Sequence, residues 1–166
     1  MNKIVIFGNS GSGKTTLANR YVDRYHLAYL DLDLIAWEDT DPPCRKPLLD
    51  SAKSIKKFTD NNNSWVIEGC YADLLSLVVS QSTEVIFLNP GVETCLDNCR
   101  NRPWEPHKYS SSEAQNNNLD MLLNWVKQYE QREDEFSLSA HQALFDAFTG
   151  HKKQYNANIS ELSMLK

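Results

Sequence analysis

Gly8-Asn9-Ser10-Gly11-Ser12-Gly13-Lys14-Thr15 is the stretch that decides the fold of this chain. It follows the apolar run 4–7, precedes a helix-patterned segment, and has the spacing G-x-x-x-x-G-K-[ST] of a phosphate-binding P-loop. The glycines allow backbone amides to face inward, where a side chain would block a phosphate. We expect Lys14 to reach the β- and γ-phosphates, Thr15 to complete the shell of a Mg²⁺ ion, and Thr16 to join the nucleotide site. The sequence therefore predicts binding of ATP with Mg²⁺.

Length and composition indicate how many domains the chain forms and which partners to expect. The chain has 166 residues and a net charge of -5, with a pI near 5.3. This length fits one domain spanning 1–166, and the acidic balance disfavours nucleic acid and anionic membranes as partners. No apolar run approaches the ~20 residues that span a bilayer. No signal peptide is visible, and the four cysteines lack C-x-x-C spacing; we therefore expect a cytoplasmic protein with free thiols, as a monomer or a homodimer.

Strand and helix patterns alternate along the whole chain. We expect strands at 3–7, 28–30, 65–67, 85–88 and 153–157, with helices at 14–26, 47–59, after Tyr71, and at 92–101, 112–135, 138–148 and 159–165. The alternation favours an α/β fold with a parallel sheet and helices on both faces. Two pliable inserts interrupt it: an acceptor-binding insert at about 34–64 and a lid at about 100–118.

Three acids follow strands at the edge where parallel strands deliver ligand-facing groups. Asp31 and Asp33 follow the second expected strand, and Glu68 follows the third. One aspartate can orient a Mg²⁺-bound water while the other, for which we favour Asp33, accepts a proton from a substrate hydroxyl. Glu68 stands where a Walker B carboxylate assists the metal. The structural alternatives are a solvated turn for the aspartates and a helix cap for Glu68.

Further side chains are candidates for gripping an acceptor. Arg45 stands at a helix entrance, where it can hold an anionic acceptor, and Tyr71 is expected to line the acceptor pocket. Arg132 lies in an acidic run, where either a surface ion pair or a contact to phosphate fits.

The lid carries its own candidates. Arg100 and Arg102 can neutralise the transferring phosphoryl group once the lid closes, or stack on a purine ring, unless the segment is a tolerated surface insertion. His107 and Lys108 are weaker candidates in the same lid. Asn156 and Asn158, near the end of the chain, are candidates for contacts to adenine.

Taken together, these stretches resemble the nucleoside-monophosphate-kinase and shikimate-kinase group of three-layer P-loop NTPases. They are most similar to small bacterial ATPases described as adenylate-kinase-like or DNA-topology-modulation proteins. The resemblance implies a five-stranded parallel sheet of order 2-3-1-4-5 and phosphoryl transfer from ATP with Mg²⁺. It also matches Asp31 and Asp33 to the paired acids of shikimate kinases, Glu68-Gly69 to the Asp-Gly of nucleotide kinases, and Arg102-Pro103 to a lid Arg-Pro.

Two departures limit what the resemblance says about the acceptor. Gly69-Cys70-Tyr71 stands where shikimate kinases have three glycines, and the Phe-Pro-Arg of adenylate kinases is missing. The resemblance therefore implies the donor more firmly than it implies shikimate or AMP. We predict a phosphotransferase acting on a small-molecule or nucleotide acceptor. The alternative classes are a nucleotide-dependent ATPase or switch with a macromolecular partner, and a module that binds nucleotide without turnover.

Overall fold

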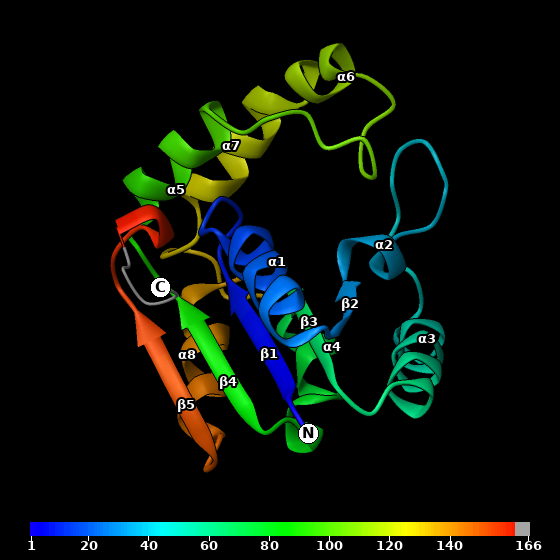
Figure 1. The fold of residues 1–166 in the computed structure, drawn as a ribbon. Coiled ribbons are helices and arrows are strands. Elements are labelled where there is room, and N and C mark those ends of the chain that lie inside the picture. The colour runs from blue at the N-terminus through cyan, green and yellow to red at the C-terminus, as the bar shows by residue number, and fades with distance from the viewer. Residues whose placement is uncertain (162–166) are drawn as a thin grey trace.

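The computed structural model describes residues 1–161 and has a five-stranded sheet at its centre (Figure 1). All four pairings are parallel, and the strand order is β2-β3-β1-β4-β5. The strands are β1 (Lys3–Gly8), β2 (Ala28–Asp31), β3 (Trp65–Gly69), β4 (Glu84–Leu88) and β5 (His151–Tyr155). The fold class and the sheet order implied by the resemblance are confirmed.

The central strand β1 is buried on both faces, and its side chains alternate between two cores. Ile4 and Ile6 pack with Leu17 of α1 (Lys14–Tyr25), whereas Val5 and Phe7 pack in a second core with side chains of α4 (Ala72–Ser76) and α8 (Leu138–Ala147). Successive side chains of a strand point to opposite faces, so a continuous apolar run feeds both cores. Figure 1 shows α1 on the near face of the sheet and α8 behind it.

The remaining helices surround this sandwich. They are α2 (Asp33–Ala36), α3 (Leu48–Asn61), η1 (Val79–Gln81), α5 (Val92–Arg100), α6 (Ser112–Asn117), α7 (Leu119–Lys127) and η2 (Ile159–Glu161). In Figure 1 α5, α6 and α7 lie across the carboxyl end of the sheet. A small apolar cluster joins α5 to α7, with Cys95, Leu96 and Cys99 packed on Val126. Within residues 1–161 no helix is both long and apolar enough to cross a membrane.

The structure differs from the sequence-based elements at three places. The helix expected over 112–135 is two helices, because α6 ends before Asn118 and α7 ends at Lys127, after which turns follow. The last strand begins at His151, two residues early, where Lys153 and His151 both approach Glu84 of β4. The short helix α2 was not expected. Of the helix expected over 159–165, η2 covers the first three residues and the rest lies outside the described part of the chain.

Candidate functional site

The loop between β1 and α1 has the backbone that a phosphate cradle requires. Gly11 and Gly13 have φ of 79° and 95°, a region that favours glycine. A Cβ on Gly11 would lie 2.3 Å from the backbone oxygen of Cys95, so the loop is also pressed against α5. Asn98 of α5 donates a hydrogen bond to the carbonyl of Gly11 at 2.8 Å, and Asn9 donates one to the carbonyl of Val126 in α7 at 3.3 Å. Both helices therefore hold the loop in place.

The side chains of Lys14 and Ser12 are both buried in this loop. Lys14 is the first residue of α1, and its Nζ donates to the carbonyl of Asn9 at 2.8 Å, so its ammonium lies across the loop. The hydroxyl of Ser12 is buried and has no hydrogen-bond partner among the described residues. Glycines that exclude side chains, an ammonium at the mouth and an orphaned hydroxyl fit a phosphate chain.

The register of the sheet brings the predicted acids together. Glu68 of β3 pairs with Asp31 of β2, and both carboxylates are almost fully buried. Glu68 Oε1 accepts hydrogen bonds from the hydroxyls of Thr15 at 2.7 Å and Tyr29 at 2.9 Å. Asp33 begins α2 rather than extending β2, and its N–H donates to Asp31 Oδ1 at 2.9 Å.

The surroundings of these acids shift their pKa values in different directions. Burial, and then the charge of Asp31, raises the pKa of Glu68 to about 7. Burial and the neighbouring Asp33 also raise the pKa of Asp31. Burial acts in the same sense on Asp33, but the Lys108 ammonium outweighs it and lowers the pKa of that carboxyl. Asp33 is therefore held ionised at neutral pH, whereas the pKa of Glu68 lies close to neutral pH.

Lys108, a weaker candidate from the sequence, lies at the centre of the acidic cluster. Its Nζ lies 2.7 Å from Asp33 Oδ2 and 3.1 Å from Asp31 Oδ2, and also 3.7 Å from Glu105 Oε1. The lid segment that carries it is tied down by Gln115, which accepts from the N–H of Glu105 at 2.9 Å and donates to the carbonyl of Pro103 at 3.1 Å. The N-cap of α6 is Ser111, whose side chain accepts from the N–H of Ala114.

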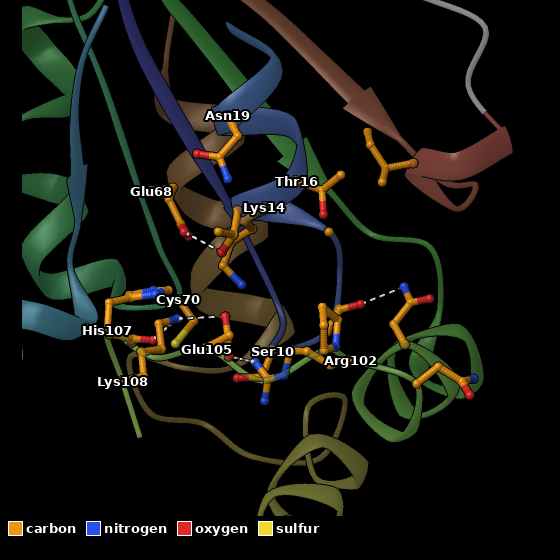
Figure 2. A pocket seen from close by; sticks show the side chains of 18 of the residues that line it. Ser10, Lys14, Thr16, Asn19, Glu68, Cys70, Arg102, Glu105, His107 and Lys108 are labelled. Atoms are coloured by element: carbon orange, nitrogen blue, oxygen red, sulfur yellow. Dashed lines mark hydrogen bonds and ion pairs between the residues drawn. The ribbon is translucent and has the colours of Figure 1, made fainter. Parts of the chain in front are cut away.

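A cavity of about 530 Å³ joins the phosphate loop, Asp33, Glu68 and the lid; Asp31 is not among the residues that line it. Its lining includes Ser10, Lys14, Thr15, Thr16, Asp33, Glu68, Arg102, Glu105, Lys108 and Asn158. Figure 2 shows Glu68 and Lys14 on one side and Glu105, His107 and Lys108 of the lid on the other. Asn19, Arg20 and Asn98 also line the cavity, although no sequence motif singled them out.

The predicted arginines lie in different places. Arg102 lines the cavity, paired with Glu105 at 3.0 Å, whereas Arg100 is exposed, paired with Asp97 at 2.8 Å, and is not part of the lining. Arg45 and Arg132 do not line it either, and each is paired with carboxylates of its own surroundings. Asn158 reaches the cavity, but Asn156 does not.

Tyr71 is buried instead of lining the cavity. Its hydroxyl donates to Asp33 Oδ1 at 2.6 Å and accepts from Trp37 Nε1 at 2.7 Å. One oxygen of Asp33 is thus fixed from the protein interior, and the other, Oδ2, faces Lys108.

Comparison with solved structures identifies the fold. A sugar kinase from Janibacter sp. is similar over 93% of this chain and 84% of its own, with 15% identity and a TM-score of 0.53. The chain shares the fold of this sugar kinase. An uncharacterised protein from Eubacterium ventriosum is similar over 96% of this chain and 92% of its own (14% identity, TM-score 0.50). A shikimate kinase from Acinetobacter baumannii covers 87% of this chain and 91% of its own, with 18% identity and a TM-score of 0.44. No family model and no curated protein matches the chain.

Proposed function

We propose that this protein is a P-loop kinase that transfers the γ-phosphoryl group of ATP to a hydroxyl of a small acceptor. The observation that carries the proposal is that the phosphate loop and Asp33 line the same cavity. Lys14 and the loop amides would hold the donor phosphates at one end of this cavity. Asp33, with its pKa lowered and one oxygen fixed by Tyr71, offers Oδ2 to an acceptor at the other end.

The transfer needs positioning and charge stabilisation more than covalent chemistry. A bond forms between the acceptor oxygen and the γ-phosphorus, the bond from that phosphorus to the β–γ bridging oxygen breaks, and the hydroxyl proton passes to Asp33 Oδ2. Arg102, the lid arginine that lines the cavity, is placed to neutralise charge on the transferring group. Arg100 would join it only if the lid rearranged.

The residues around Thr15 suit a magnesium ion. When bound, Mg²⁺ neutralises charge on the phosphates as they are transferred. Thr15 and Glu68 are already joined by a hydrogen bond, whereas Asp31, also a candidate for the metal, has its carboxylate against Lys108. In the part of the chain that the structure describes, no three His, Cys, Asp or Glu side chains form a ready metal cage. Such an arrangement fits Mg²⁺, which usually keeps several waters and takes few protein ligands.

The test is a phosphoryl-acceptor screen with ATP and Mg²⁺ over nucleoside monophosphates, nucleosides, sugars, amino alcohols and cyclic polyols. We expect a phosphorylated product that is lost in Lys14→Ala and retained in Lys57→Ala, an exposed lysine on α3. ADP formation without any phosphorylated small molecule, stimulated by a macromolecular partner, would instead support an ATPase or switch. Unchanged ATP affinity in Lys14→Ala would contradict the donor site.

A further inference from the structure

The two arginines considered for an anionic acceptor, Arg45 and Arg132, are each paired with carboxylates of the protein. Arg45 pairs with Asp73 at 2.9 Å and Glu135 at 2.8 Å, and its guanidinium lies 4.9 Å from the Tyr71 ring centre. Arg132 pairs with Asp134 at 2.6 Å, with its guanidinium 3.6 Å from the centre of the Trp125 ring. A carboxylate or phosphate on the acceptor would have to break these pairs and leave their acids without partners.

The acceptor end of the cavity instead surrounds an ammonium of the chain itself. Lys108 Nζ lies against Asp31, Asp33 and Glu105, and its side chain is only 14% exposed. Burial alone lowers the pKa of Lys108, but these carboxylates, Asp33 first, raise it above its ordinary value. The cluster is therefore complementary to a protonated amine.

Two carboxylate oxygens define this ammonium subsite. Oδ1 of Asp31 is taken by the N–H of Asp33, and Oδ1 of Asp33 is taken by Tyr71. Oδ2 of Asp31 is buried and accepts no hydrogen bond from residues 1–161, although Lys108 and His107 lie 3.1 and 3.7 Å from it. Oδ2 of Asp33 is the atom to which an acceptor hydroxyl must come, and Lys108 covers it at 2.7 Å.

An acceptor must therefore displace Lys108, and displacement would leave two neighbouring carboxylates without a cation. A neutral polyol leaves this charge uncompensated, and an anionic acceptor adds to it. Resting on the phosphotransferase function above, we propose that the acceptor is a small hydroxyl compound that carries a primary amine. Its ammonium replaces that of Lys108 against Asp31 Oδ2, and its hydroxyl lies beside Asp33 Oδ2.

The first experiment tests the subsite without turnover, by saturation-transfer NMR with methylammonium. Lys108→Ala should bind methylammonium saturably and at least tenfold more tightly than the unaltered protein, and Lys127→Ala, an exposed lysine of α7, should not. Tetramethylammonium, which has the same charge but no N–H donor, should give no saturable signal. Adding Asp31→Asn to Lys108→Ala should weaken binding about tenfold or more, because the charged acceptor of the ammonium's hydrogen bond is removed.

Three results of this experiment would overturn the proposal. They are equal methylammonium binding with and without Lys108, equal binding of tetramethylammonium, and displacement of methylammonium by Mg²⁺ alone, which would make the aspartates a metal site. If Lys108→Ala unfolds without cooperativity, Lys108→Met, which retains an unbranched stem, takes its place.

The second experiment uses turnover. Amino alcohols, amino sugars and aminocyclitols are each offered with ATP and Mg²⁺ as the free amine, the N-acetyl derivative and a carboxylate analogue. We expect kcat/KM for the free amine to exceed that of its N-acetyl partner by about tenfold or more, the size of a lost charge-assisted hydrogen bond. Better turnover of neutral or carboxylate compounds would refute the acceptor class. If no compound is phosphorylated the kinase function fails, and the methylammonium result still decides the subsite.

Discussion

His141 should make the stability of this protein fall between about pH 6.5 and pH 4. The imidazole has no exposed surface and lies between Phe7, Phe87 and Tyr129. Its Nε2 lies 2.8 Å from the carbonyl of Cys70, which can only accept, so Nε2 carries the proton. Nδ1 then accepts from the Tyr129 hydroxyl at 2.7 Å, and the neutral ring is fully satisfied.

The magnitude follows from the difference between the folded and unfolded pKa. Burial lowers the pKa of His141 to about 4, against an ordinary value of 6.5. Between these values the unfolded chain binds more protons than the folded one, so the unfolding free energy falls as the pH falls. The contribution is fully present above the unfolded pKa, and about 3 kcal/mol is lost by the folded pKa. At about pH 5 the loss is about 2 kcal/mol.

Urea unfolding at about pH 7 and pH 5 measures this loss, with His141→Gln as the matched variant. Glutamine keeps a donor for Cys70 and an acceptor for Tyr129 but does not titrate, and the other three histidines are exposed in both proteins. The unaltered protein should lose about 2 kcal/mol more than the variant between the two pH values. Parallel losses in the two proteins would refute the buried, neutral assignment.

Three further predictions concern the site. Lys14→Ala should raise the dissociation constant for ATP about tenfold or more by calorimetry, while Lys57→Ala leaves it unchanged. Asp33→Asn should lower turnover by a factor on the order of a hundred or more and leave ATP affinity nearly intact; retained turnover would remove Asp33 from the mechanism. Gly11→Ala should destabilise the protein more than Gly91→Ala, because both have positive φ but only the Gly11 Cβ meets backbone, at 2.3 Å. Equal melting temperatures in the last pair would mean that the loop shifts freely.

The sheet was predictable because its signals are local. The apolar residues of β1 alternate between two cores, and the P-loop spacing fixes where that strand ends and α1 begins. Together with βα alternation, these features admit few topologies. The same logic explains why Glu68 and Asp31 were expected near each other, since adjacent parallel strands deliver their last residues to one edge.

The predicted boundaries of helices and strands were wrong where tertiary packing, and no local sequence signal, determines where an element ends. A continuous helical pattern runs through Asn118, yet α6 and α7 separate there, and Asn118 binds the Tyr109 hydroxyl of the lid at 3.0 Å. The last strand is an edge strand with polar side chains, so hydrophobic periodicity did not fix its start. Its observed start aligns His151 with Glu84 of β4.

The charge partners could not be read from the sequence for a different reason. Arg45 and Glu135 lie 90 residues apart, and Lys108 lies 75 positions beyond Asp33, in a segment without periodicity. Ion pairs over such separations depend on the complete fold. The available signal was weaker: buried acids at a strand edge require a cation, and the lid was the place to look for one.

The pairings also decide how this cavity can discriminate between ligands. Arg102 and Lys108, two cations of the lid that line the cavity, each already have a carboxylate at 3.0 Å or less. A ligand therefore gains little by simple attraction, since it must exchange partners with a satisfied pair. Exchange favours a ligand that leaves no buried charge unpaired. At Lys108 that condition is met by another ammonium, because it can pair with the Asp31 carboxylate that Lys108 would leave.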